Sequence, residues 1–384
     1  KISRSVLENY LARSATVASL LHYTLDDDLR MIKNTGAKFA GRVIWMWGNE
    51  SRIDALVRKG EPFVKRIHAM DPDIILQGAI FEIVTTDVDN VAIPASVFNE
   101  FGLKPEARNF RYKDMLYSFR RRVDHWSKGA SVPDMSRLET RMWFFYVGKR
   151  WIDMGLEAIH FGQVEIMDDR DRDHTHWRDM MKRIRKYAGK HARRHLVLAD
   201  AHTPSGGIVH EGELMFDLHS FPSRPKSVRG KPYQAVLEKS FSDSIYGRSK
   251  GGRTPSGWSC KALPYIVELD NFGSSDHAGE YRAADKFHVW GWDEIGWFTK
   301  QPEKYRNEWL KYAYNWIRKT DPNGYFQLPL RRFQHYTASM KPPKGQRQEE
   351  TIKAIWRSAM IPPNLPATHG VPCSVSLPVA SDSK

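Results

Sequence analysis

The sequence contains little cysteine and no long apolar run. Cys260 and Cys373 are the only cysteines among 384 residues; their positions exclude a C-x-x-C metal or redox motif, and their spacing does not tell whether they pair. No run of about 18 apolar residues occurs, which argues against a membrane span. The chain opens at Lys1 without Met, which is compatible with removal of a signal peptide, and we expect a secreted or periplasmic protein.

Several motifs of catalysis and ligand binding are also missing. No G-x-G-x-x-G turn follows an early apolar run, which argues against a dinucleotide site. No G-x-S-x-G elbow marks a nucleophilic serine, and no zinc-finger spacing or RNP-like string supports nucleic-acid binding. The pair His174 and His176 opens a charged helical stretch in mid-chain, where a solvated helix start is expected rather than a zinc site. The sequence therefore predicts no metal, no cofactor and no nucleic-acid partner.

Positive charge and tryptophan are abundant. The net charge is +14, and 13 Trp contribute to an aromatic content of 12%. A basic field concentrates anionic partners, and indole rings suit stacking on sugar rings, although many fill core volume.

Short apolar runs alternate with amphipathic helical stretches. This rhythm predicts βα units around a parallel sheet. The expected helices are 27–34, which stops before Gly36, and 54–69, 136–154, 176–191 and 303–319. The expected strands are 41–47, 74–84, 158–165, 195–201, 214–219, 265–270, 287–292 and 325–328.

Eight such units predict an α/β fold, a (β/α)8 TIM barrel with long insertions on its carboxyl-terminal face. We expect one catalytic barrel over residues 1–360, with insertions at about 85–133 and 221–264 and a flexible extension over 361–384. The strand count has two registers. If 15–22 is strand one, then 158–165 is strand four, 265–270 strand seven and 287–292 strand eight; otherwise these three are strands three, six and seven. We favour the first register.

Two glutamates end apolar runs. Glu165 closes AIHFGQVE, and Glu268 lies near the end of YIVELD. Barrel enzymes carry catalytic residues at the carboxyl ends of strands, and retaining glycosidases pair two carboxyl groups about 5–5.5 Å apart. We expect these two glutamates to be the catalytic pair.

In the favoured register this layout resembles the clan of (β/α)8 retaining glycoside hydrolases, which carry glutamates at the ends of strands four and seven. The resemblance implies that Glu165 is the acid/base, that Glu268 is the nucleophile, and that a glycosidic bond in a poly- or oligosaccharide is hydrolysed. The clan usually has Asn directly before the acid/base, whereas Val164 stands here and Gln163 supplies an amide one position earlier.

Other polar and aromatic residues gather at the ends of the runs. Such a set suits a sugar subsite, although Asp293 or Glu294 can instead cap the following helix or replace Glu268 as the second carboxylate. His160 suits a core or supporting role, and His202 and His219 suit substrate contact, base or loop roles equally. The expected substrate-binding residues are Trp47, Asn49, Glu50, His160, Gln163, His202, His219, Asn271, Trp290, Trp292, Asp293 and Glu294.

Residues 221–255 carry eight basic and two acidic side chains, a local net charge of +6. Because Arg matches carboxylate and sulfate oxygens, an anionic glycan is the expected substrate; a mobile, soluble lid explains the same charge. A different sugar-active barrel (isomerase, lyase or metal-dependent hydrolase) and a non-catalytic carbohydrate-binding barrel remain the alternatives. The oligomeric state is not predicted.

Overall fold

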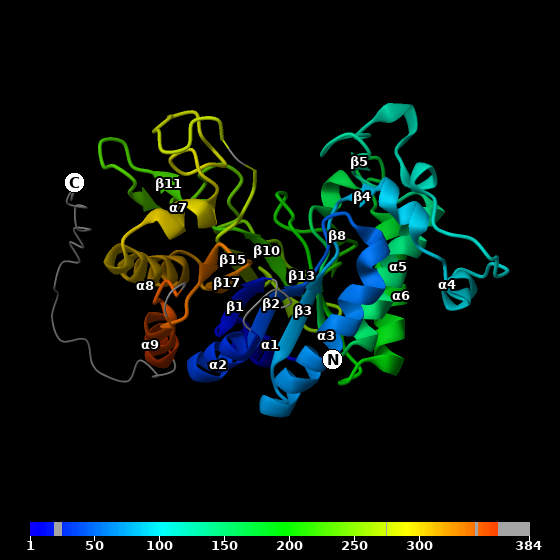
Figure 1. The fold of residues 1–384 in the computed structure, drawn as a ribbon, viewed down its shortest axis with the longest axis horizontal. Coiled ribbons are helices and arrows are strands. Elements are labelled where there is room, and N and C mark those ends of the chain that lie inside the picture. Colours follow the sequence, from blue (N-terminus) through cyan, green and yellow to red (C-terminus); the bar gives the residue numbers. More distant parts are fainter. Residues whose placement is uncertain (19–24, 274, 342–344, 360–384) are drawn as a thin grey trace.

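The computed structural model describes residues 1–18, 25–273, 275–341 and 345–359. They form a mixed α/β fold around a large parallel sheet, with helices on both sides of the strands (Figure 1). The expected extension at 361–384 and the end of the expected first strand, at 19–22, lie outside the described residues.

The largest sheet has seven strands in the order β18-β17-β1-β2-β3-β6-β7. Every neighbouring pair is parallel except β17 and β18. The strands are β1 (Ser14–Ala18), β2 (Phe39–Ile44), β3 (Ile75–Ala79), β6 (Ala158–His160), β7 (Leu198–Asp200), β17 (Leu328–Arg332) and β18 (Tyr336–Thr337).

A second sheet has three parallel strands, β10 (His219–Pro222), β15 (Tyr265–Glu268) and β16 (Gly324–Phe326). Hydrogen bonds join the two sheets at both edges. Gln327, between β16 and β17, donates its backbone N–H to Val267 O at 2.8 Å, and the opposite edges meet through Asp217 N and Ala199 O at 2.8 Å. A parallel bridge between His202 and Ser220 extends that second junction.

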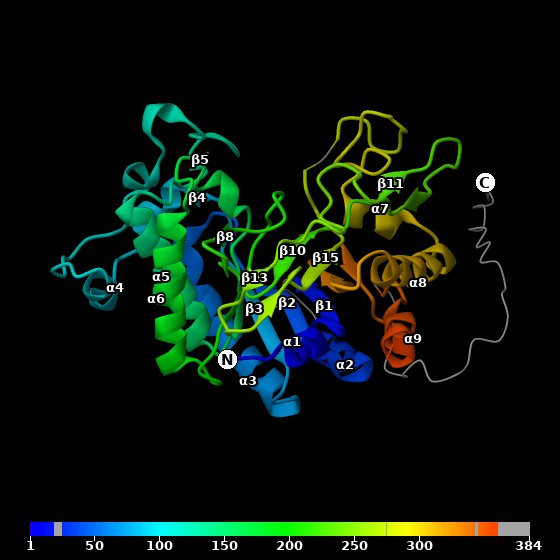
Figure 2. The ribbon, with the colours of Figure 1, turned by 180° about the vertical axis from the view of Figure 1, so that it is seen from behind.

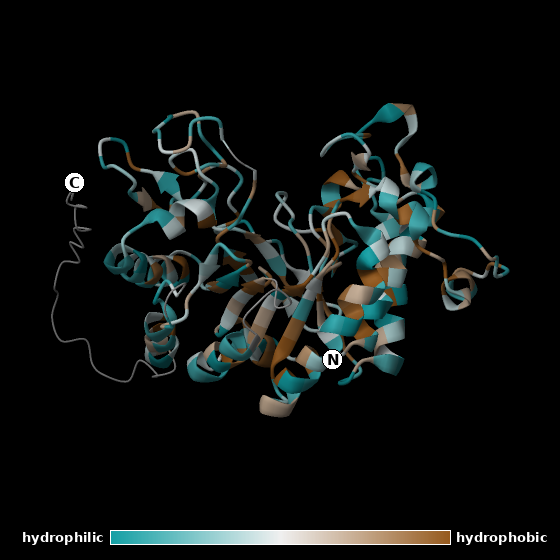
Figure 3. Ribbon diagram, viewed as in Figure 1, coloured by the Kyte–Doolittle hydropathy of each residue, from teal (hydrophilic) through white to brown (hydrophobic). Residues whose placement is uncertain are grey.

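Helices flank the strands on two sides (Figures 1 and 2). The hydrophobic residues of α3 face inward at a spacing of three or four, through Ile53, Val57 and Val64 to Ile67, as an amphipathic helix requires. Figure 3 shows the resulting stripes, with the central strands more apolar than the outer helix faces. The helices are α1 (Arg4–Leu11), α2 (Leu25–Thr35), α3 (Ile53–Met70), α4 (Ala95–Glu100), α5 (Leu138–Asp153), α6 (Thr175–His191), α7 (Glu294–Lys300), α8 (Glu303–Thr320) and α9 (Glu349–Ala359).

Helix α1 packs against the amino ends of the strands. Its Leu7 and Leu11 share one apolar cluster with residues from the beginnings of the parallel strands. Because α1 occupies this end, the carboxyl ends point to the opposite side. Members of the cluster from the strands and their approaches are Phe39, Ile75, Ala158, Leu198, Leu218, Ile266 and Tyr325.

The two expected insertions contain small elements of their own. The segment 85–133 includes α4 and the pair β4 (Val84–Thr85) and β5 (Ala130–Ser131), and the segment 221–264 includes two short antiparallel pairs. The first insertion and residues 226–236 of the second lie on the side of the sheet away from α1 (Figures 1 and 2). The end of the second insertion returns to the opposite side, where Trp258 donates its indole N–H to Ile2 O at 3.1 Å and packs against the apolar cluster of α1. The pairs in the second insertion are β11 (Lys226–Ser227) with β12 (Ala235–Val236), and β13 (Gly252–Arg253) with β14 (Ser259–Cys260), the latter joined to β8 (Val209–His210) and β9 (Glu213–Leu214).

The five expected helices are confirmed as α2, α3, α5, α6 and α8. One strand prediction is wrong: residues 287–292 form no strand, and only an isolated bridge joins Val289 to Trp292. Backbone φ values of 52° at Trp290 and 73° at Gly291 break the extended conformation there. The expected strand at 214–219 is displaced, because its beginning belongs to β9 and its last residue begins β10.

Candidate active site at the carboxyl ends of the strands

Polar side chains fill the space that the parallel strands enclose above the apolar cluster. Glu268 of β15 lies among them with 4% of its surface exposed. Its Oε1 forms an ion pair with Arg42 of β2. Its Oε2 accepts hydrogen bonds from Thr16 Oγ1 at 2.9 Å and from Gln327 Nε2 at 3.2 Å. Both carboxylate oxygens are therefore occupied by protein, and the surrounding space has no room for a water molecule.

His160 and Asp200 form a second pair in this polar layer. His160 Nδ1 lies 2.7 Å from Asp200 Oδ2, and Gln77 Nε2 donates to Asp200 Oδ1 at 2.6 Å. Burial raises the pKa of Asp200 to about 7, even though hydrogen bonds from Ser220 and Gln77 oppose the shift. Burial, together with the charge of Arg42, holds the pKa of His160 well below its ordinary value. The pair therefore retains a proton on Asp200 near neutral pH while His160 stays neutral.

This pair makes stability depend on pH. An unfolded aspartate loses its proton near pH 4, but folded Asp200 keeps it to about pH 7. Between these values the folded state binds more protons, so the free energy of unfolding falls as pH rises, by up to about 1.4 kcal/mol per pH unit. We expect Asp200→Asn to remove this part of the slope in urea titrations at pH 4, 5, 6 and 7. Parallel wild-type and variant curves would contradict the shifted pKa.

Arg42 connects the polar layer to the carboxyl-end surface. Its backbone has φ 58°, and the β2–β3 register shifts between Ala40 and Ile44, so the strand bends locally at this arginine. Besides Glu268, its guanidinium reaches His202 Nε2 at 3.0 Å and lies 5.5 Å from the ring centre of Phe81. Because His202 Nε2 faces a permanent cation, it acts as an acceptor, and the pKa of His202 lies well below its ordinary value, chiefly through burial.

Asp270 lies just beyond the end of β15 and is largely buried, with 8% of its surface exposed. It follows Glu268 by two residues, and its side chain is 12% exposed. Its Oδ1 accepts the backbone N–H of Asn271 at 2.9 Å, whereas Oδ2 lies 3.9 Å from Arg224 and has no hydrogen bond among the described residues. Arg332 approaches Oδ1 at 3.9 Å.

Basic groups keep Asp270 ionised. Burial alone would raise the pKa of this carboxyl group, but the positive charges of Arg224, Arg42 and Arg332 outweigh it, and the pKa falls below its ordinary value. An ionised carboxylate with one unoccupied oxygen can act as a base or as a nucleophile.

Glu294, at the start of α7, holds the backbone around Asp270. It accepts the N–H of Asp270 at 3.2 Å, the N–H of Arg224 at 3.0 Å and the hydroxyl of Ser223 at 2.7 Å. Burial raises the pKa of Glu294 to about 7. Asp293 caps α7 by accepting the N–H of Gly296 at 2.7 Å, as the capping alternative predicts. Glu294 therefore positions the ends of β10 and β15, and only 2% of its surface is exposed.

Glu165 lies outside the polar layer. It belongs to a 3₁₀ turn, Val164–Ile166, that follows β6, and it is half-buried. Ser205, in the loop after β7, donates a hydrogen bond to its Oε1. The neighbouring Gln163 is bound to the buried Glu82 through its backbone N–H at 2.8 Å and its amide at 2.7 Å. The amide of Gln163 is thus directed to Glu82.

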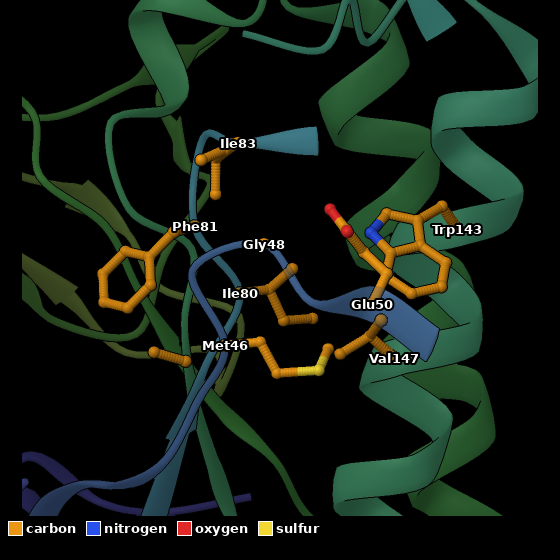
Figure 4. A pocket seen from close by; sticks show the side chains of 9 residues that line it. Met46, Gly48, Glu50, Ile80, Phe81, Ile83, Trp143 and Val147 are labelled. Carbon is orange, nitrogen blue, oxygen red and sulfur yellow. The ribbon is translucent and has the colours of Figure 1, made fainter. Parts of the chain in front are cut away.

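Trp47 and Asn49 lie at the surface beyond β2, where they line a hollow of about 360 Å³ together with Trp45 and Phe333. Glu50, by contrast, turns inward. It accepts the N–H of Thr85 at 2.8 Å and the Thr85 hydroxyl at 2.5 Å. Figure 4 shows it beside Trp143 and Val147, at a void of about 20 Å³ that has room for about one water.

The remaining residues that the sequence predicts to bind substrate differ in how deeply they are buried. His202 and Trp292 are half-buried and Asn271 is exposed, so a ligand can reach them. His219 is fully buried, its Nδ1 lies 3.0 Å from Ser249 Oγ, and burial lowers its pKa to about 3. Trp290 is 6% exposed and donates to Gln234 O at 2.8 Å. Six of the expected site residues are therefore buried in the structure, namely Glu50, His160, His219, Trp290, Glu294 and Glu268.

Sequence reasoning missed Asp270, Arg42 and Arg332. The strand period carries a usable signal, because Glu268 and Asp270 are two residues apart and so share a face. Of two residues on the same face of a strand, the one later in the sequence lies nearer the carboxyl end of that strand.

Across the described ranges, no three His, Cys, Asp or Glu side chains are arranged to hold a metal ion. His174 instead lies 3.1 Å from Asp168, and His176 lies 2.9 Å from Arg141. None of the described helices combines the length and the apolar character of a membrane span.

Comparisons with known proteins give low similarity. No protein-family model matches the sequence, and no curated protein matches it. A GH27 β-L-arabinopyranosidase from Geobacillus stearothermophilus is 10% identical, with 90% of this chain and 76% of that chain covered and a TM-score of 0.41. A putative alpha amylase from Salmonella typhimurium is 10% identical, with 71% and 49% covered and a TM-score of 0.36. For the debranching enzyme from Nostoc punctiforme the identity is 8%, the coverage 52% and 49%, and the TM-score 0.33.

The chain thus spans about half the length of the last two proteins. At such TM-scores the similarities carry no functional assignment, which must come from the residues themselves.

Proposed function

We propose that this chain is a glycoside hydrolase built on a (β/α)8 barrel, with Glu165 and Asp270 as its working carboxylates. The observation that carries the proposal is Asp270, an ionised carboxylate with an unoccupied oxygen, at the carboxyl end of a parallel strand beside three arginines. Catalytic residues of barrel enzymes lie at this end of the strands.

The strand connections support a barrel. Hydrogen bonds link the two sheets at both edges, through Gln327 at one and through Asp217 and the His202–Ser220 bridge at the other. If these links close the two sheets into one ring, eight parallel strands follow in the order β1, β2, β3, β6, β7, β10, β15 and β16–β17, as a (β/α)8 barrel requires. The helix α1 then plugs the amino end of the ring.

The chemistry of glycosidic hydrolysis needs two carboxyl groups with different roles. Glu165, half-buried and held by Ser205, donates the proton to the leaving oxygen. Asp270, kept ionised by its basic neighbours, attacks the anomeric carbon in a retaining mechanism. Water then cleaves the glycosyl–enzyme ester, and Glu165 takes the proton of that water. The sequence predicts Glu268 as the nucleophile. We assign it a structural role instead, because its carboxylate holds the guanidinium of Arg42 in an ion pair.

A panel of poly- and oligosaccharides assayed for new reducing ends tests the proposal. We expect wild-type protein to cleave at least one glycan and Glu165→Gln to lower kcat/KM for it by about 10²–10⁴-fold, because the leaving oxygen loses its proton donor. Glu350→Gln, on the outer helix α9, is the matched control and should change kcat/KM less than about twofold.

Activity on no member of the panel, or unchanged turnover in Glu165→Gln, would contradict the proposal. Product stereochemistry by NMR separates retention from inversion of the anomeric configuration.

A further inference from the structure

Beyond β2 an aromatic groove continues outward from the carboxyl-end surface. Trp45 and Trp47 both contact Phe81, with ring centres 5.3 and 5.7 Å from it. Phe81 in turn contacts His160 at 5.8 Å and the guanidinium of Arg42 at 5.5 Å. The rings therefore form a continuous path from the polar layer beside Asp270 to the hollow of about 360 Å³ that Trp45 and Trp47 line.

Trp47 is a fixed and accessible platform. It is 41% exposed, although burying an indole ring is favourable. Trp126, from the insertion 85–133, meets it edge-on at 5.0 Å and 68°, and donates its own indole N–H to Glu82 O at 2.9 Å. The position of Trp47 is thus set before any ligand arrives, which lowers the entropy cost of stacking against it. The indole N–H of Trp45, by contrast, is buried and has no hydrogen-bond partner among the described residues.

Two cations border the same hollow. Arg52 and Lys59 are seven residues apart, so they lie on one face of the helical segment at the start of α3, with Ala55 and Leu56 between them. Both are exposed, and neither side chain forms an ion pair or hydrogen bond with the residues that the structure describes. A small, partly apolar floor between two unpaired cations can accept a ligand that carries negative charge.

Four of the eight cations in the basic loop 221–255 are less suited to this role, because they are bound within the protein. Arg224 is bound to Asp243 and Glu294, and Lys226 to Glu238. Arg248 and Lys250 donate to backbone carbonyls of Pro204 and Gly207. These four cations of the loop are therefore occupied within the protein.

We propose that this groove is a subsite for an anionic sugar residue, which stacks on Trp47 and places its carboxylate or sulfate group between Arg52 and Lys59. The proposal rests on the proposed function and extends it by naming the substrate class and the residues that select it. Neutral glycans would occupy the aromatic platform without engaging the two cations.

Binding measurements test the subsite independently of turnover. Calorimetric titrations of Glu165→Gln protein use three probes of similar length: an oligogalacturonate, a heparin oligosaccharide and a neutral cello-oligosaccharide. We expect at least one anionic probe to bind about tenfold or more tightly than the neutral one. Adding Arg52→Ala and Lys59→Ala should weaken that binding by about tenfold or more, and Trp47→Ala by a similar factor. The preference of one anionic probe over the other distinguishes carboxylate from sulfate.

The matched control is the pair Arg58→Ala and Lys65→Ala, which removes two exposed cations from a different face of α3, about 100° round the helix from Lys59. It should change the affinity less than about twofold. Equal binding of neutral and anionic probes, equal losses in the two pairs, or equal binding of a single-stranded DNA of the same charge would overturn the subsite. Selective binding without cleavage by the wild type would leave the subsite standing and contradict only the proposed hydrolysis.

Discussion

Replacing Asp270 by asparagine should lower kcat/KM on the best glycan by about 10²–10⁴-fold or more, while the protein stays folded. The variant removes the negative charge at the unoccupied oxygen and keeps an oxygen that can accept the N–H of Asn271. The neighbouring arginines lose one anion, but each has another contact, Arg224 with Asp243 and Arg332 with Leu269 O. Circular dichroism and the melting temperature check that the fold persists.

Glu268→Gln is the matched comparison, because it makes the same chemical change two residues earlier. Glu268 has both oxygens bonded within the protein, so this variant should lower stability more than it lowers turnover at a temperature where it is folded. If Glu268→Gln abolished turnover with an unchanged melting temperature and Asp270→Asn remained active, the pair that the sequence predicts would be the catalytic one.

Arg42→Met should lower the free energy of unfolding by about 3–5 kcal/mol, because it leaves the buried carboxylate of Glu268 without its counter-charge. The Arg42 and Glu268 side chains are 5% and 6% exposed, so water cannot replace the lost partner. Urea titrations measure the change.

Two further variants make the stability prediction specific. Removing both charges, in Arg42→Met with Glu268→Leu, should cost less than Arg42→Met alone, because no unpaired buried charge remains. Arg66→Met breaks an ion pair whose side chains are 50% and 86% exposed and should cost less than about 1 kcal/mol. A loss for Arg42→Met as small as that for Arg66→Met would show that the buried pair does not form.

The periodicity of the sequence predicts the helices well and the strands less well. In α3 and α8 the apolar residues recur every three or four positions and face one core, so local pattern and tertiary packing agree. The aromatic run at 287–292 satisfies the strand pattern equally, but its tryptophans serve another purpose. Trp290 and the nearby Trp297 donate their indole N–H groups to carbonyls of Gln234 and Tyr233 in the second insertion. Such contacts between distant parts of the chain cannot be predicted from a local sequence pattern.

The candidate site shows the same division. Sequence pattern places polar residues at strand ends, and His202, Trp47 and Asn49 are accessible there. The pattern does not tell how deeply a side chain is buried, because burial depends on the position of each strand along its neighbours. The sequence therefore predicts an accessible strand-end position for Glu268, whereas in the structure Arg42, Thr16 and Gln327 enclose it. The positive φ of Arg42, which accompanies its inward reach, is equally invisible in the sequence.

Hydrolysis in water enriched in heavy oxygen tests the central claim most directly. A glycan that wild-type protein cleaves is incubated in the labelled water, and mass spectrometry locates the label in the fragments. We expect one heavy oxygen at the new reducing end for each bond cleaved, because water completes the cleavage at the anomeric carbon. With Asp270→Asn the labelled product should form about 10²–10⁴-fold more slowly. Unlabelled fragments that carry a new carbon–carbon double bond would identify an elimination instead and would contradict the two-carboxylate hydrolysis proposed for this site.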